Sequence, residues 1–257
     1  MRRLFWASPA LLLFFVLDVN AQISASQTAI DSFKKGNAAY EKHDLKTALI
    51  FYNAAITADP RYADAYYNRG NVRYRQRDLD GALEDYTKAV QLNPAMAFAY
   101  SNRGLVLRIQ GKIGQAMDNF ERAIRFNPRL AEAYTNRGIA FFKLGDLKAA
   151  MHDFNKAVDF NGKLVEPYLN RAAVLFFQGK LDQALKDYNR VIKLNPGSAL
   201  AYANRGIVHL MLGREDEANL DFRRCLELDG GLKPVLEKSI QEALERSYSI
   251  AAFLPHF

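Results

Sequence analysis

The sequence predicts an all-α solenoid, a stack of helix–turn–helix repeats, and three observations carry this prediction. The chain resembles itself when it is shifted by 34 residues, over six consecutive repeats without an insertion. Each repeat holds two runs of about 14 residues with apolar side chains at i, i+3, i+4 and i+7, the spacing of an amphipathic helix. A small residue and an aromatic ring recur at fixed positions of every repeat. Because one helical pair cannot bury its own apolar face, the repeats must stack.

The first 21 residues are expected to be a signal peptide. Arg2 and Arg3 precede an apolar run, residues 4–17, and Ala21 ends a small-residue pattern that places a cleavage site before Gln22. The run is too short to span a bilayer, which needs about 20 residues. We therefore expect an exported protein, periplasmic or secreted, with an uncleaved N-terminal membrane anchor as the alternative. Residues 22–28 would form a short lead into the first repeat.

Four positions within the repeats explain how each helical pair would form. Repeats 1 to 6 are residues 29–62, 63–96, 97–130, 131–164, 165–198 and 199–232. Position 8 is Gly in five repeats and Ala in the fifth, position 20 is always Ala, position 24 is always Phe or Tyr, and position 32 is Pro in four repeats. The small residues let two helices approach closely, the ring fills the space beside them, and Pro ends the second helix. A Gly between the two runs, as at Gly145, would supply the turn.

This pattern resembles the tetratricopeptide repeat (TPR) family, whose consensus ends in an Ala, an aromatic residue four positions later and a Pro eight positions after that. The resemblance covers all six repeats. It implies a right-handed solenoid whose concave groove is lined by the first helix of each pair and binds a segment of a partner protein. It also implies that the chain is not an enzyme.

The resemblance assigns groove positions, which are polar and basic in repeats 2 and 3 and largely apolar in repeats 4 to 6. The candidate partner-binding residues are Asn68, Asn71, Tyr74, Arg75, Asn102, Arg108, Asn136, Phe142, Asn170, Phe176, Phe177 and Asn204. Five of them are the Asn at position 6, whose amides offer donors and an acceptor to an extended peptide backbone. The alternative is that these amides bond to water or to neighbouring side chains. The apolar positions mark either an exposed partner site or packing between repeats and under a cap.

A second set of polar residues is predicted to hold the repeats together. Position 7 is Arg in repeats 2 to 6, and position 23 is Asp in four of these repeats and Asn119 in repeat 3. Repeat 1 has Lys35 and Phe51 at the same two positions. We expect the Arg to form a charge-assisted hydrogen bond to the Asp of its own repeat. Loss of this Arg should then reduce stability rather than partner binding.

No cofactor, metal or catalytic centre is expected from the sequence. The four His residues fall at unrelated repeat positions, and the single cysteine, Cys225, excludes an intramolecular disulfide and occupies a position that is Ala or Val in the other repeats. No phosphate-binding or nucleophile motif appears. A further noncatalytic possibility is that Arg69, Arg73, Arg75 and Arg77 bind an anionic polymer, which would make binding strongly dependent on salt. Export argues against nucleic acid, and no small-molecule substrate is expected.

The charge is uneven along the chain, which carries a formal net charge of +7. Residues 29–130 hold 16 basic and 11 acidic side chains, whereas residues 131–232 hold 14 and 13. Residues 233–248 are predicted to form a capping helix. The apolar tail, 249–257, is expected either to be disordered or to dock in a groove, its own or that of a second copy in a homodimer.

The predicted function is that of a noncatalytic scaffold or adaptor of the cell envelope, which binds an extended or helical segment of a partner protein. The alternative is a structural subunit of an envelope or secretion assembly, associating through edge and tail surfaces.

Overall fold

The computed structural model describes residues 26–253, with side chains described as far as Glu245. The chain divides into two units, residues 1–128 and 129–257. The expected signal peptide, the first residues of the lead and the end of the apolar tail lie outside the described residues. The expected docking of the tail lies outside the described side chains.

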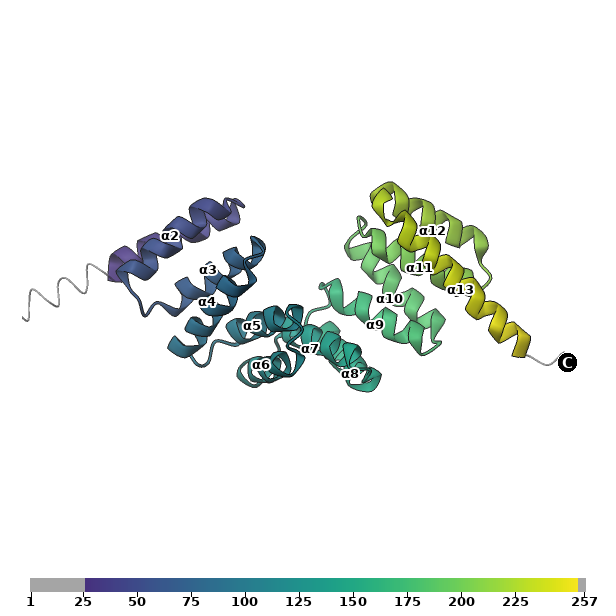
Figure 1. Cartoon of the computed structure of the whole chain (residues 1–257), viewed down its shortest axis with the longest axis horizontal. Coiled ribbons are helices and arrows are strands. Elements are labelled where there is room, and N and C mark those ends of the chain that lie inside the picture. Colours follow the sequence, from purple (N-terminus) through teal and green to yellow (C-terminus); the bar gives the residue numbers. More distant parts are fainter. Residues whose placement is uncertain (1–25, 254–257) are drawn as a thin grey trace, which may run out of the picture. The chain divides into compact units, whose positions relative to one another are not determined.

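The N-terminal unit consists of three helix–turn–helix pairs (Figure 1). Its first helix covers residues 26–41. The helices that follow are α2 (Leu45–Ala58), α3 (Ala63–Arg75), α4 (Leu79–Leu92), α5 (Ala97–Ile109) and α6 (Ile113–Phe126). Repeats 1 to 3 each supply one pair, as the two apolar runs per repeat predict.

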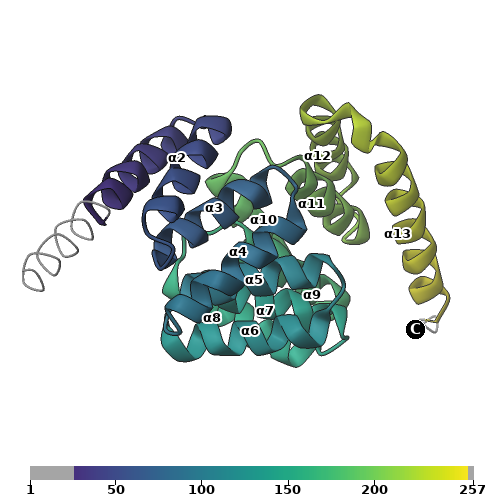
Figure 2. The same ribbon diagram turned by 60° about the vertical axis from the view of Figure 1, so that its left-hand side comes forward.

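The C-terminal unit has three further pairs and a final helix (Figures 1 and 2). The pairs are α7 (Ala131–Lys143) with α8 (Leu147–Phe160), α9 (Glu166–Phe177) with α10 (Leu181–Leu194), and α11 (Ala199–Met211) with α12 (Glu215–Leu228). A short 3-10 helix, η1 (Gly230–Leu232), leads into α13 (Lys233–Phe253). The final helix is five residues longer than the predicted 233–248, so it includes part of the segment assigned to the tail. The all-α prediction is confirmed over the described residues.

Close approach of the two helices in a pair depends on position 8. A Cβ atom added to Gly138 of α7 would lie 2.7 Å from the Phe154 ring of α8, and one added to Gly70 would lie 2.7 Å from the Tyr86 ring. Both distances are shorter than normal carbon contacts, so a larger residue would displace the ring. Ala150 at position 20 is fully buried in the same contact. The small residues therefore have the packing role that the sequence indicates.

The turns between paired helices use left-handed backbone, which Gly adopts without steric cost. In repeats 3 to 6 the turn residue has φ between 71° and 82°; these residues are Gly111, Gly145, Gly179 and Gly213. Asp146 then accepts a hydrogen bond from the Ala149 N–H and caps the N-terminus of α8. Pro at position 32 is not essential for helix termination, because α8 and α12 end at the same repeat position with Gly162 and Gly230 in its place.

The final helix covers the apolar side of α11. Leu236 and Ala243 of α13 are buried in one cluster with Ile207 of α11 and with Phe222 and Cys225 of α12. Cys225 is thus a buried core residue, as its place in the repeat predicts. Within residues 26–253, no helix combines the length and the apolar character needed to cross a membrane.

Candidate functional site

The position-7 arginines join the two helices of a repeat, as predicted. In repeats 2, 4, 5 and 6 the closest nitrogen–oxygen distance to the position-23 carboxylate is 2.6 or 2.7 Å; the pairs are Arg69–Asp85, Arg137–Asp153, Arg171–Asp187 and Arg205–Asp221. The four carboxylates are buried. The hydrogen bond to the carboxylate raises the pKa of Arg171 and of Arg205 above the usual value. These ion pairs are internal to the fold.

The same arginines also connect neighbouring repeats, which the sequence reasoning missed. Nη1 of Arg205 donates to Oδ1 of Asn189 in the preceding repeat, at 2.6 Å. Arg171 donates to Asn155 at 2.8 Å, and Arg69 donates to Asn53 at 2.7 Å. All three acceptors stand at position 25 of the preceding repeat. Each of these arginines therefore holds three helices together.

Repeats 1 and 3 depart from this arrangement in the way their sequences indicate. In repeat 1, Lys35 Nζ lies 5.8 Å from the centre of the Phe51 ring, so a cation–π contact replaces the ion pair. In repeat 3, Arg103 Nε donates to Oδ1 of Asn119 at 2.7 Å. No carboxylate lies within ion-pair distance of Arg103 among the described residues. Burial lowers the pKa of Arg103, and the nearby Arg122 acts in the same direction.

Two of the four arginines that the sequence suggested as a basic face form ion pairs within the chain. Arg73 lies 3.0 Å from the Asp85 carboxylate, which also receives Arg69. The Arg75 guanidinium lies 4.4 Å from the centre of the Tyr40 ring. Arg69 and Arg73 thus share one carboxylate within the chain, whereas Arg75 and Arg77 are exposed, so an anionic polymer as ligand stays a prediction.

The position-6 asparagines of the N-terminal unit bond to neighbouring side chains, which is the alternative left open above. Asn102 Nδ2 donates to Oδ1 of Asn71 at 2.9 Å, and Tyr86 Oη donates to the same oxygen at 2.8 Å. Asn68 and Tyr52 converge in the same way on Asn37, each at 2.8 Å. These amides link adjacent repeats. Nδ2 of Asn68, Nδ2 of Asn102 and Oδ1 of Asn71 are therefore used within the fold, and partner binding by these residues stays a prediction.

Because these tyrosines are buried, we expect the folded protein to lose stability as the pH rises above 10. Burial raises the pKa of Tyr52 to about 12, so the folded protein retains a proton that the unfolded chain loses near the usual value of about 10. The contribution of Tyr52 is thus complete below pH 10 and is lost as pH rises towards 12. We expect Tyr52→Phe, which copies position 24 of repeats 3, 4 and 6, to have a shallower loss of stability between pH 9 and pH 11.5. Urea midpoints measured at both pH values test this, and a decline equal to that of the wild type would contradict it.

In the C-terminal unit, some of the predicted asparagines interact with other groups of the chain, and one does not. Asn170 Nδ2 donates to the Glu166 carbonyl one turn earlier in α9, at 2.9 Å. Asn136 is half-buried on α7 and has a partner of its own. Asn204 on α11 makes no hydrogen bond with any described residue. It is half-buried and faces a pocket, so it is the member of the row that retains its donors and acceptor for a ligand.

The apolar candidates form one surface around this pocket. The Phe142 and Phe177 ring centres are 5.6 Å apart, and those of Phe176 and Phe177 are 6.0 Å apart. Phe177 is 58% exposed. A pocket of about 180 Å³ is lined by Phe176, Phe177, Asn204 and Ile207 together with Ser239, Glu242 and Ala243 of α13. We call these seven residues the α9–α11–α13 pocket.

The apolar positions divide into residues that are covered by packing and residues that remain exposed. Ile207 is 8% exposed, and Leu210 and Met211 pack against the same cluster under α13. Phe177 remains exposed, whereas Phe176 lines the pocket and packs both against the cluster around Leu175 and against the cluster under α13. The capping helix therefore covers part of the apolar face and builds one wall of the remaining pocket.

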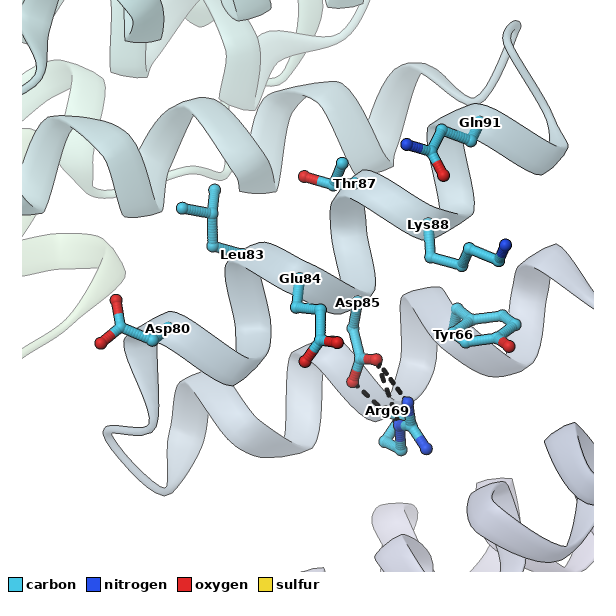
Figure 3. A pocket seen from close by; sticks show the side chains of 9 residues that line it. All are labelled: Tyr66, Arg69, Asp80, Leu83, Glu84, Asp85, Thr87, Lys88 and Gln91. Carbon is cyan, nitrogen blue, oxygen red and sulfur yellow. Dashed lines mark hydrogen bonds and ion pairs between the residues drawn. The ribbon is translucent and has the colours of Figure 1, made fainter.

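The remaining candidates of the N-terminal unit lie outside the lining of its pockets of about 750 and 390 Å³. Tyr74 packs partly buried against the Tyr86 cluster, Arg75 is exposed beside Tyr40, and Arg108 is half-buried on α5. A larger pocket, of about 750 Å³, lies instead around the Arg69–Asp85 pair. Figure 3 shows its lining, which comes from α3 and α4: Tyr66, Arg69, Asp80, Leu83, Glu84, Asp85, Thr87, Lys88 and Gln91. Sequence reasoning missed this face because it assigned function to the first helices alone.

Comparison with known proteins agrees with the repeated geometry. One family profile, tetratricopeptide repeat, matches residues 63–96 and 131–164. A second, TPR repeat, matches residues 36–77, 104–145 and 174–213, and the two together cover more than half of the chain. This protein belongs to the tetratricopeptide repeat family. No curated protein matches it significantly over its sequence.

Solved structures similar to this TPR protein are TPR proteins as well. YrrB, described as a TPR protein with an unusual peptide-binding site, is 26% identical with a TM-score of 0.53, over 70% of this chain and 92% of YrrB. A TPR protein from Parabacteroides merdae is 23% identical with a TM-score of 0.61, over 87% and 93% of the two chains. PilF of Pseudomonas aeruginosa is 18% identical with a TM-score of 0.74, over 87% and 99%. The last two similarities concern the fold alone.

Proposed function

We propose that this TPR protein is a noncatalytic scaffold that binds a peptide segment of a partner protein in the α9–α11–α13 pocket. The observation that supports the proposal is the combination of an exposed aromatic ring, Phe177, with an amide, Asn204, that has no partner among the described residues. Apolar area that is exposed next to unsatisfied polar groups is typical of peptide-binding surfaces. YrrB is 26% identical to this chain and is described as having an unusual peptide-binding site, which adds support.

The pocket suggests which part of a peptide it would receive. Its volume of about 180 Å³ suits one apolar side chain rather than a whole ligand, and Phe176 and Ile207 supply apolar walls. Asn204 could donate to a backbone carbonyl and accept from a backbone N–H of the same segment. Phe177, at the rim, would cover the neighbouring side chain. Binding would therefore combine one buried anchor with backbone contacts that do not depend on sequence.

A selection from a random peptide library displayed on phage tests this proposal. We expect wild-type protein to enrich peptides that share an apolar anchor, and Phe177→Ala to weaken their binding by about 30-fold, the usual cost of losing an interface aromatic of about 2 kcal/mol. Phe126→Ala is a matched control, since Phe126 is 45% exposed on α6 in the N-terminal unit. Equal binding by the wild type and the Phe177 variant, or loss with the Phe126 variant alone, would contradict the proposal.

A further inference from the structure

Repeat 3 contains an arginine whose usual partners are missing. Its counterparts Arg171 and Arg205 each donate to a buried carboxylate and, through Nη1, to an Asn at position 25 of the preceding repeat. For Arg103 the first partner is replaced by Asn119 and the second by Thr87. The one hydrogen bond of the Arg103 guanidinium within the described residues is from Nε to Asn119, at 2.7 Å. Compared with Arg171 and Arg205, these two substitutions remove the side-chain acceptors of the terminal nitrogens, Nη1 and Nη2, of Arg103.

The amide of Asn119 cannot replace the missing charge. Its own Nδ2 donates to the Gln115 carbonyl at 2.7 Å, which fixes the side chain with its oxygen towards Arg103. The amide oxygen therefore accepts a hydrogen bond from one guanidinium N–H, whereas a carboxylate accepts two parallel hydrogen bonds from a guanidinium. Because an arginine remains protonated in proteins, Arg103 keeps a full positive charge in a half-buried place.

A second cation and an open volume lie beside this guanidinium. A pocket of about 390 Å³ is lined by Leu83, Thr87, Arg103, Leu107, Gln115, Asp118, Asn119 and Arg122. The guanidiniums of Arg103 and Arg122 both lie over the Tyr100 ring, 5.3 and 5.8 Å from its centre. Asp118 is the one carboxylate of the lining, and it is not within ion-pair distance of either arginine. The volume falls in the range of about 300–1,000 Å³ that is usual for ligand sites.

We propose that this pocket is a second binding site, independent of the α9–α11–α13 pocket, and that it takes an Asp or Glu side chain of a partner protein. The chemistry is that of repeats 2, 4, 5 and 6, in which the same arginine position holds a carboxylate from within the chain. In repeat 3 the partner supplies it. Leu83 and Leu107 form an apolar border that would contact the stem of the acidic residue. The excess of basic side chains over residues 29–130 favours an acidic partner in the same region.

The test is a titration of the full chain with a blocked pentapeptide, Ala-Ala-Asp-Ala-Ala, and with its Asn counterpart. The readout is the Nε–Hε resonance of Arg103 in nitrogen-15 spectra. We expect the Asp peptide to shift this resonance saturably and to bind about tenfold or more tightly than the Asn peptide, the usual effect of a charge-assisted hydrogen bond. Equal responses to the two peptides would overturn the proposal. Saturation by inorganic phosphate at a lower concentration than by the Asp peptide would overturn the assignment to a carboxylate.

Two variants of the pocket provide opposite controls. Asn119→Asp supplies the carboxylate within the chain, so the Arg103 resonance should respond to the Asp peptide about tenfold less. Asp118→Asn removes the competing negative charge, so it should strengthen binding. If Asn119→Asp bound the peptide as tightly as the wild type, or Asp118→Asn weakened binding, the proposal would be wrong.

Discussion

Replacement of Arg205 by alanine is expected to lower the free energy of unfolding by about 3–5 kcal/mol, because it leaves a buried carboxylate without its partner. Asp221 is 4% exposed and receives Arg205 Nε and Nη2 at 2.7 and 2.6 Å. The variant also loses the bond to Asn189 that joins repeats 5 and 6. Urea unfolding followed by circular dichroism measures the change.

The double variant Arg205→Ala with Asp221→Asn separates the stranded charge from the lost packing. Removal of the carboxylate should recover part of the stability, since the remaining amide is less costly to bury. A single variant as stable as the wild type would show that the ion pair has no structural role. Partner binding by the single variant, measured under conditions in which it is folded, should be unchanged.

The second large effect is expected at the capping helix. Leu236→Asp places a charge without a partner in a position that is 5% exposed, so α13 should leave α11 at a cost of about 3 kcal/mol or more. The apolar surface of Ile207, Leu210 and Met211 would then be uncovered, and the α9–α11–α13 pocket would lose one wall. We expect increased amide hydrogen exchange in residues 233–245 and loss of the selected peptides.

Val235→Asp is the matched control for this variant. Val235 precedes Leu236 on the same helix and is 63% exposed, so a charge there remains in water. Its exchange pattern and peptide binding should equal those of the wild type. Equal behaviour of the two variants would contradict the described packing of α13.

The repeat pattern alone predicted the features that depend on contacts within one repeat. Gly138 against Phe154, the turn at Gly145 and the Arg137–Asp153 pair all join residues of one 34-residue unit. Comparison of the aligned repeats therefore reveals both partners at once. Even the exception was indicated, since Lys35 occurs in the repeat that has Phe51 in place of an acceptor.

The features that were missed depend on contacts between repeats. Asn102 bonds to Asn71, 31 residues earlier, and Arg205 bonds to Asn189, 16 residues earlier but in the preceding repeat. A signal for the first contact was present, because Tyr at position 24 occurs with Asn at position 9 in repeats 1 and 2, and Phe at position 24 occurs with Leu or Ile at position 9 in repeats 3, 4 and 6. Repeat 5 departs from this pattern, with Tyr188 and Ala173. Such contacts depend on the direction in which side chains point at the boundary between repeats. The periodicity of the sequence does not reveal this direction.

The missing partners of Arg103 illustrate the same difference. The sequence shows Asn119 in place of Asp, which looks like a mild substitution. At position 25 of repeat 2, Thr87 stands where Asn155 and Asn189 accept from the arginines of the following repeats. The structure shows that Thr87 and Asn119 border one pocket. The basic site is therefore visible only when both neighbours of the arginine are known.

Asn204 and Arg205 are adjacent in one helix, and we assign binding to the first and stability to the second. The most direct test of this assignment measures urea unfolding and peptide binding for Asn204→Ala and Arg205→Ala in parallel. We expect Asn204→Ala to unfold like the wild type but to bind the selected peptides at least about fivefold more weakly, since a hydrogen bond contributes about 1 kcal/mol. We expect Arg205→Ala to be destabilised by about 3–5 kcal/mol and, while folded, to bind normally. A destabilised Asn204 variant together with a stable Arg205 variant that no longer binds peptide would show that the two roles are assigned the wrong way round.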